Sequence, residues 1–198
     1  MVNAFVQIMD EGLLYKNGKG EKTMRVILDE EVYEITQAKP EDLHKVLELL
    51  VNAAAWLKTK RTEQWSYYLT DLDGNKEEIL RSIENGATYL VKKEGQPVST
   101  LTIENDPSEW DVDLWGEEAQ DEVVYLHRLV VHRSHGGKGL GAALLDWVEK
   151  EAKEAGNKFI RFDCIARNEG LNHYYQERYT LKEVIHIHGR HSKYEIVL

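Results

Sequence analysis

The chain has 198 residues, of which 42% are hydrophobic, and this composition predicts a single domain with a packed core. Its formal net charge of −10 disfavours a phosphate backbone as partner, so we expect no nucleic acid among its ligands. No apolar run is long enough to span a bilayer, and no basic segment precedes an apolar one at the N-terminus. We therefore expect a cytoplasmic protein without a membrane partner. Cys164 is the only cysteine, which excludes an internal disulfide and a cysteine-based zinc cluster.

Residues 1–31 read as an N-terminal extension that differs from the rest of the chain, and residues 32–198 read as the main domain. Two interpretations of the extension stay open. One is a β-hairpin that turns at Asn17-Gly18. The other is a misassigned start: the Gly- and Lys-rich stretch before Met24 resembles a translated ribosome-binding site, so Met24 is a candidate initiator.

The first half of the main domain predicts a strand, two helices and a hairpin. Residues 32–38 alternate in polarity as a strand does, and a helix begins at Pro40, where proline suits a first turn. A second helix is expected over 75–86 and a hairpin over 87–105. Residues 106–122 are expected to form a long acidic loop.

The second half predicts one strand–loop–helix–strand unit, followed by a helix and a hairpin. The strands are expected over 122–131 and 158–166 and the helix between them over 140–156; a short helix over 169–179 and a terminal hairpin over 182–198 follow. We therefore expect an α/β (α+β) fold with a central, mostly antiparallel mixed sheet of about six to seven strands, flanked by about four helices.

The segment RSHGGKGLG before the 140–156 helix predicts a phosphate site, because glycine-rich backbone amides at a helix start bind anions. A P-loop is excluded, since Gly139 follows Lys138 where that motif needs Ser or Thr. A dinucleotide fingerprint stays open: residues 137–142 match G-x-G-x-x-A, and Asp163 lies where a ribose-binding acid belongs. That alternative predicts an NAD-binding oxidoreductase, although the loop before the first glycine is long for it.

From Val32 onward the chain resembles the GNAT N-acetyltransferase superfamily. The glycine loop follows the apolar strand end HRLVV as the family's pyrophosphate loop does, with Gly136 where Arg or Gln is usual. Asn168 and Tyr175, seven residues apart, match an asparagine that contacts the coenzyme and a tyrosine beside the thioester sulfur. The resemblance implies a GNAT fold, acetyl-CoA as co-substrate, and a bacterial acetyltransferase of small molecules or proteins. It also implies direct attack by a primary amine in a ternary complex.

The resemblance also implies which residues hold the coenzyme. The expected set comprises Leu129, Val130, Val131, Gly137, Lys138, Gly139, Leu140, Gly141, Ala142 and Asn168. Amides of the loop would meet the pyrophosphate, and the strand end would pair with the peptide-like pantetheine arm. A backbone amide at or next to Val131 would polarise the thioester carbonyl.

Two catalytic roles follow from the resemblance. Tyr175 is the expected general acid, which protonates the leaving thiolate. Asp163 is the first candidate for the general base, because it matches by position an acid of the family's ribosomal-protein acetyltransferases. His127, Glu122 and a water chain without any single essential residue remain alternatives for the base. Cys164, which faces the opposite side of its strand, is expected to be a buried cysteine and not a nucleophile.

The terminal hairpin carries His186, His188 and His191, and the first two are expected to share one strand face. No third ligand accompanies them, so we expect no metal. Edge strands of this hairpin make a homodimer plausible.

The acceptor side is less specific. The acidic loop holds Trp110 and Trp115, which suit either a cationic acceptor or a solvated loop that the tryptophans fix in place. Gln64 and Trp65 resemble a segment near the acceptor pocket of bacterial relatives. A small molecule, a polyamine and a protein N-terminus all stay open as acceptors. A module that binds acyl-CoA without turnover is the alternative function.

Overall fold

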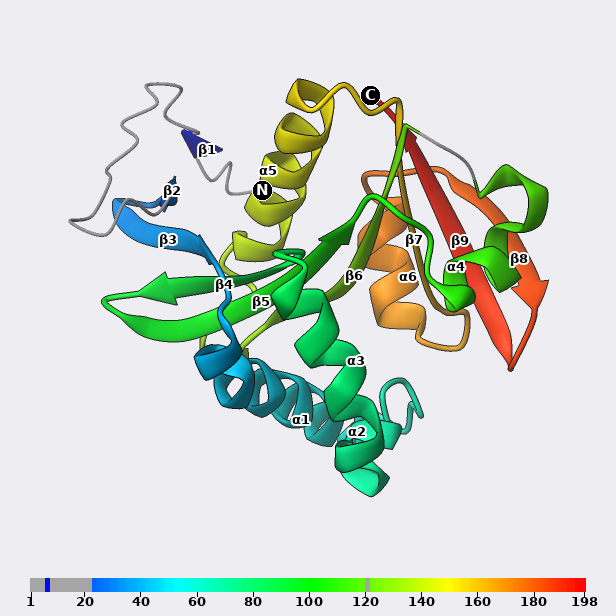
Figure 1. The fold of residues 1–198 in the computed structure, drawn as a ribbon, viewed down its shortest axis with the longest axis horizontal. Helices are drawn as coiled ribbons and strands as arrows, with labels where there is room; N and C mark the ends of the chain where they lie inside the picture. The colour runs from blue at the N-terminus through cyan, green and yellow to red at the C-terminus, as the bar shows by residue number, and fades with distance from the viewer. Residues whose placement is uncertain (1–5, 8–22, 120–121) are drawn as a thin grey trace.

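The computed structural model describes residues 6–7, 23–119 and 122–198 (Figure 1). The strands within these residues are β1 (Val6–Gln7), β2 (Met24–Leu28), β3 (Glu31–Gln37), β4 (Thr88–Lys93), β5 (Gln96–Glu104), β6 (Val123–Val131), β7 (Phe159–Ile165), β8 (Leu181–His186) and β9 (Arg190–Val197). The α-helices are α1 (Leu43–Thr59), α2 (Tyr67–Thr70), α3 (Leu72–Glu84), α4 (Glu109–Trp115), α5 (Leu140–Glu154) and α6 (Glu169–Gln176).

One mixed sheet joins all nine described strands in the order β1-β2-β3-β4-β5-β6-β7-β9-β8. Every neighbouring pair is antiparallel except β6 and β7. The expected fold class is therefore confirmed, although the described residues hold more strands and more helices than the sequence predicted. The additional elements are short: β1, β2, α2 and α4 have between two and seven residues, too few for a clear periodic pattern.

The start of the sheet includes residues that the sequence grouped with the extension. β2 pairs with β3 along its whole length, and its Val26 and Leu28 are buried in the main core. The turn between the two strands uses Asp29 and Glu30 at positive φ. The expected hairpin turn at Asn17-Gly18 lies outside the described residues, and Met24 as initiator remains a prediction.

Helices cover both faces of the sheet (Figure 1). α1 and α3 pack against one face, where Leu90 and Val130 point, while α5 and α6 pack against the other, where Val91 and Leu101 point. Central strands buried on both faces explain the continuous apolar runs in the sequence. Within the described residues, no helix combines the length and apolar character needed to cross a bilayer.

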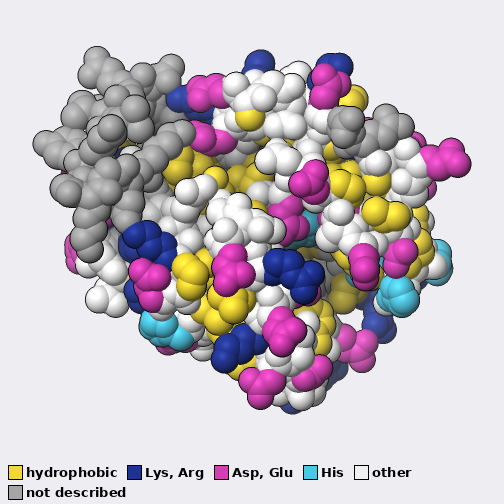
Figure 2. All heavy atoms as spheres, viewed as in Figure 1, with side chains coloured by type: hydrophobic (Ala, Val, Ile, Leu, Met, Phe, Trp, Pro, Cys, Tyr) yellow, Lys and Arg dark blue, Asp and Glu magenta, His cyan; other side chains and the backbone are white. Residues whose placement is uncertain are grey.

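The surface charges are mixed. On the face seen in Figure 2, basic and acidic side chains are interspersed, so the excess of carboxylates does not gather there into a single patch. A mixed surface of this kind gives no broad field that would select one macromolecular partner. The specific chemistry of the chain is therefore to be sought in its cavities.

A gap opens in the middle of the sheet. β6 and β7 pair in parallel only over Val123–Tyr125 and Phe159–Arg161, and beyond these residues the two strands diverge (Figure 1). On its other edge β6 contains a bulge, because Thr100 pairs with Val130 whereas Thr102 pairs with His127. Arg128, in the bulge, has φ +55°, and such an irregularity re-aims the residues that follow it.

Candidate active site

A cavity of about 910 Å³ lies beside the gap between β6 and β7. It is lined by nearly all the residues that the sequence assigned to the coenzyme: Leu129, Val130, Val131, Gly137, Gly139, Leu140, Gly141, Ala142 and Asn168. Lys138 is the exception, because its side chain is exposed and does not line the cavity. The strand end, the glycine loop and the start of α6 are thus brought together as the sequence predicted.

The glycine loop turns the chain from β6 into α5. Gly137 and Gly139 have φ of +74° and +83°, a left-handed conformation that glycine adopts without strain. Gly139 is the N-cap of α5 and has no side chain to cap it, so the first amides of this helix lack a side-chain acceptor from the N-cap. The positive end of the helix dipole therefore faces a cavity in which an anion would be stabilised.

A close contact joins this loop to α6. A Cβ added at Gly141 would lie 3.0 Å from the Oη of Tyr174, which lines the same cavity. Glycine at this position therefore allows α5 and α6 to approach each other. Tyr174 is accordingly a packing residue of the cavity wall.

A second cavity of about 590 Å³ adjoins the first. The residues that line both are Gln64, Trp65, Leu129, Arg167, Leu171 and Tyr175. The bulged strand β6 and helix α6 thus form the wall where the two cavities meet. A molecule in each cavity would come together at Leu129 and Tyr175.

Tyr175 is held firmly at this meeting point. Its ring packs against Phe162 at 4.7 Å and Tyr194 at 5.4 Å between centroids, and the residue is 7% exposed. Its hydroxyl makes no hydrogen bond to any described residue. Burial raises the pKa of Tyr175 far above its ordinary value, so the phenol stays protonated at neutral pH.

Asn168 fixes the start of α6. Its Oδ1 accepts a hydrogen bond from the backbone N–H of Leu171 at 3.3 Å, and its Nδ2 donates to Gln64 Oε1 at 2.7 Å. The sequence identified Asn168 and Gln64 separately, and the structure joins them across 104 positions of the chain. No local pattern could have predicted that contact.

Asp163, the first candidate for the base, lines the second cavity, but both its oxygens are engaged. Trp110 Nε1 donates to its Oδ1 at 3.1 Å, and His191 Nδ1 lies 2.8 Å from its Oδ2. Asp163 is therefore a hydrogen-bonded carboxylate that orients its neighbours. No pattern in the sequence indicated that His191 would reach it.

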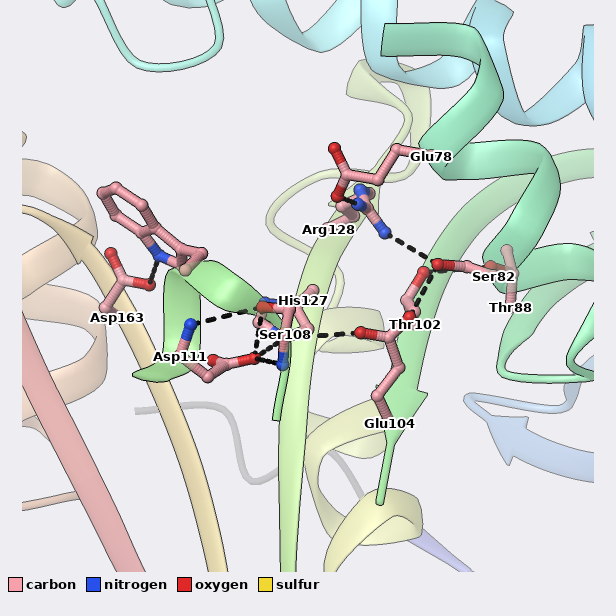
Figure 3. Close-up of polar contacts among 11 residues, drawn as sticks. Glu78, Ser82, Thr88, Thr102, Glu104, Ser108, Asp111, His127, Arg128 and Asp163 are labelled. Carbon is pink, nitrogen blue, oxygen red and sulfur yellow. Dashed lines mark hydrogen bonds and ion pairs between the residues drawn. The ribbon is translucent and has the colours of Figure 1, made fainter. Parts of the chain in front are cut away.

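His127 also lines the second cavity, and it faces two carboxylates (Figure 3). Its Nε2 lies 3.1 Å from Asp111 Oδ2 and 3.8 Å from Glu104 Oε2. Burial alone would lower the pKa of His127, but the hydrogen bond and charge of Asp111 outweigh it and raise the pKa. The same pairing keeps the pKa of Asp111 low despite burial. His127 is thus stabilised in its charged form.

Glu104, Asp111 and His127 could also hold a metal ion, since one ligand atom from each lies within 4.8 Å of the others. However, Asp111 Oδ2 already accepts hydrogen bonds from Ser108 N at 2.9 Å and Ser108 Oγ at 2.6 Å, besides that of His127. All three donors bind the same oxygen, Oδ2, and leave it no lone pair for a metal ion. The arrangement therefore fits an ion pair better than a metal centre.

Two sequence expectations about side chains near this site were wrong. β8 ends at His186, and His188 lies in the following turn at φ +48°, so the two histidines do not share a strand face. Glu122, an alternative base, lies where β6 and β7 meet, pairs with Lys158 and lines neither cavity. Its position removes it from the site.

The expected acidic loop contains a helix. Ser108 and Asp111 form a capping box that starts α4, and a short 3-10 helix (Gly116–Glu118) follows it. Trp115 is buried, and its ring is covered by cations of the chain itself, among them Lys193 at 4.3 Å and Arg161 at 4.5 Å. Trp115 therefore anchors α4 to the sheet, while Trp110 lines the second cavity.

Cys164 is buried, as expected. Burial raises the pKa of its thiol to about 12, so the thiolate is scarce at neutral pH. A covalent acetyl-cysteine intermediate is therefore disfavoured.

Comparison with known proteins decides the family. The profile of the Acetyltransferase (GNAT) family matches residues 50–179. The chain belongs to this family. The GNAT relative "Uncharacterized N-acetyltransferase YesJ" of Bacillus subtilis (strain 168) is 38% identical over 136 residues, which are 69% of this chain and 74% of YesJ. The chain is therefore an acyltransferase by family.

Solved GNAT structures share the fold. An acetyltransferase of the GNAT family from Listeria monocytogenes 4b F2365 superposes with a TM-score of 0.74 at 32% identity, covering 88% of this chain and 99% of its own. PaiA N-acetyltransferase from Thermoplasma acidophilum, solved in complex with coenzyme A, gives a TM-score of 0.66 at 16% identity, covering 84% and 99%. The dinucleotide alternative fails, because the described sheet has only one parallel pair and a doubly wound fold needs several.

Proposed function

We propose that this chain transfers the acetyl group of acetyl-CoA to a primary amine by direct attack in a ternary complex. The observation that carries the proposal is Tyr175: a buried tyrosine at the junction of two cavities, whose hydroxyl has no hydrogen-bond partner among the described residues. A donor in one cavity and an acceptor in the other would both reach this hydroxyl.

The first cavity suits the coenzyme. The amides that begin α5 would bind the pyrophosphate, and residues 129–131 would pair with the pantetheine arm, because their edge toward β7 lies beyond the last paired residues. An arm laid along this edge brings the thioester to Leu129 and Tyr175. A backbone amide near Val131 would then polarise the carbonyl.

The reaction balances with one proton donor and one acceptor. A neutral amine attacks the carbonyl carbon, the new C–N bond forms, and the C–S bond breaks as the tetrahedral intermediate collapses. Tyr175 gives its proton to the sulfur, whose free thiol has a pKa of about 8.5, and is reprotonated from solvent. The nitrogen loses its extra protons to a base, and one proton is released overall for each ammonium acetylated.

The second cavity suits an amine. Trp65 and Trp110 supply aromatic walls, and Glu63, Glu104 and Asp163 supply carboxylates around it. The aromatic walls can stack against an ammonium, whereas Arg128, Arg167 and Arg190 in the same lining balance the carboxylates, so the stacking and not the net charge favours an amine. The proposed acceptor class is therefore a primary amine of a small molecule or a peptide.

The test measures thiol release from acetyl-CoA with a panel of primary amines. We expect amine-dependent release by the wild type and a fall in kcat of about 10²-fold or more in Tyr175→Phe, which keeps the ring packing and removes the proton donor. Tyr174→Phe is the matched control and should stay near wild type. Acetyl-CoA should raise the melting temperature of all three proteins.

Other outcomes would contradict the proposal. A melting-temperature rise with acetyl-CoA, but no thiol release with any amine, would indicate a binding module without turnover. Full activity in Tyr175→Phe would refute the role of Tyr175 as acid.

A further inference from the structure

His191 and Asp163 form a hydrogen-bonded pair in the wall of the second cavity. Asp163 lies on β7 and His191 on β9, and their side chains are 14% and 10% exposed. Trp110, from α4, holds both partners: its Nε1 donates to Asp163, and its ring lies 4.9 Å from the His191 ring in an edge-to-face contact. Three separate elements thus fix the orientation of one imidazole.

This orientation determines which ring nitrogen of His191 carries the hydrogen and which has the lone pair. An ionised carboxylate only accepts hydrogen bonds, so Nδ1 of His191 carries the hydrogen and donates it to Asp163 Oδ2. Nε2 is then the nitrogen with the lone pair, and it has no hydrogen-bond partner among the residues that the structure describes. A Cβ added at Gly189 would lie 3.7 Å from Nε2, in van der Waals contact with it, so glycine leaves this side of the ring uncovered.

The other candidates for a base offer no comparable atom. His127 directs its Nε2 at Asp111 and is stabilised as a cation. Asp163 has both oxygens engaged, and Glu122 lines neither cavity. Of these groups, His191 alone presents a lone pair in the cavity that also exposes Tyr175.

Charged and titratable groups surround His191 on β7, on α4, in the hairpin turn and on β8 and β9. Asp163 faces it from β7, and His188, in the hairpin turn, lies against Trp110 and is 3.8 Å from Asp113 of α4. On β9 itself Arg190 precedes it, and Lys193, two residues on, is paired with Glu183 of β8. Asp163 is the charged group in direct contact with the imidazole, with its Oδ2 2.8 Å from Nδ1.

We propose that His191 is the proton acceptor for the attacking amine, and that Asp163 and Trp110 are residues that position it. The inference rests on the proposed acetyl transfer. Nε2 takes a proton from the ammonium and passes it to solvent, and after attack it takes the second proton from the positively charged nitrogen of the tetrahedral intermediate. Tyr175 protonates the sulfur, so each proton has a donor and an acceptor.

The test uses His191→Asn with three primary amines of decreasing basicity: butylamine, glycinamide and trifluoroethylamine. Asparagine keeps an N–H near the position of Nδ1 for Asp163 and removes Nε2. With butylamine, we expect kcat/KM at neutral pH to fall about 10²-fold or more, because this amine must be deprotonated. With trifluoroethylamine, which is largely neutral, the loss should be below about tenfold. The acidic limb of the wild-type pH profile should disappear in the variant.

Two controls separate catalysis from folding. His186→Asn changes an exposed histidine of the same hairpin that lines neither cavity, and it should leave all three rates unchanged. The melting-temperature rise with acetyl-CoA should be the same in His191→Asn as in the wild type. If His191→Asn does not fold, His191→Ala with added imidazole replaces it, and we expect saturable recovery of the butylamine rate.

Contrary results are distinct. Equal losses with all three amines, an unchanged pH profile, or no imidazole recovery would overturn the role of His191 and leave acetyl transfer standing. A wild type that acetylates none of the amines would overturn the proposed function and this inference together.

Discussion

The buried pair of Asp111 and His127 gives a stability prediction whose size and pH dependence follow from its contacts. Asp111→Asn removes the charge that His127 faces at 3.1 Å and weakens the capping box with Ser108. A hydrogen bond between charged groups contributes about 1.5–3 kcal/mol and a helix cap about 1 kcal/mol. Asparagine retains one acceptor oxygen, so we expect a loss of about 3 kcal/mol, or about 6–12 °C in Tm, at pH 6.

The loss should shrink as the pH rises. The pKa of His127 is raised, so the stability contributed by its charge is fully present below its ordinary value of 6.5 and is lost as the pH rises through the raised pKa. The pKa of Asp111 is lowered, so its contribution is present above its ordinary value of 3.8 and is lost in acid. At pH 6 both contributions are present, whereas above the raised pKa of His127 only a neutral hydrogen bond and the cap remain.

Thermal unfolding of the wild type and Asp111→Asn at pH 6 and pH 9 measures this difference. Asp113→Asn, on the same helix with a side chain 57% exposed, is the matched control and should change Tm by little at either pH. A Tm loss of equal size at both pH values would show that the His127 charge contributes nothing. A Tm loss that grows toward pH 9 would contradict the expected pH dependence.

Three further predictions follow from the site. Gly139→Ala, at φ +83°, should lower Tm and reduce the Tm rise given by coenzyme A, whereas Gly95→Ala, at φ +78° in the β4–β5 turn outside the cavity, should lower Tm and leave that rise unchanged; equal behaviour would contradict the role of the loop. Native Cys164 should resist iodoacetamide at pH 8 and react fully in guanidinium, as mass spectrometry would show, because burial raises its pKa to about 12. Dialysis against EDTA should leave amine acetylation unchanged, since hydrogen bonds satisfy Asp111; a loss restored by Zn²⁺ would instead identify a metal at Glu104, Asp111 and His127.

Local patterns in the sequence predicted which residues line the first cavity. The glycine loop, Asn168 and Tyr175 lie within about forty residues on consecutive elements, and their spacing reflects one strand–loop–helix–strand unit. A contact between neighbouring elements of such a unit is fixed by a short connection. For this reason these residues were found together at one cavity.

The acceptor side depends on contacts that spacing does not encode. His191 meets Asp163 only because β9 returns beside β7, with Ile165 opposite His191, and that register is set by the whole sheet. Gln64 and Asn168 are hydrogen-bonded although 104 positions separate them in the sequence. α4 could have been predicted, since Ser108 and Asp111 have the spacing of a capping box. The eight acidic residues between positions 106 and 122 favoured the interpretation of this segment as a loop.

The divergence of β6 and β7 has a consequence for solubility. An unpaired strand edge at the rim of a sheet is a template on which another chain can add and start aggregation. Here two such edges lie between central strands, with α1 and α3 on one face of the sheet and α5 and α6 on the other. Because helices cover both faces, the sheet of another protein cannot align beside these edges as it could at the rim. Hydrogen-bonding backbone can therefore stay open in the middle of the sheet at less risk of aggregation than at its rim.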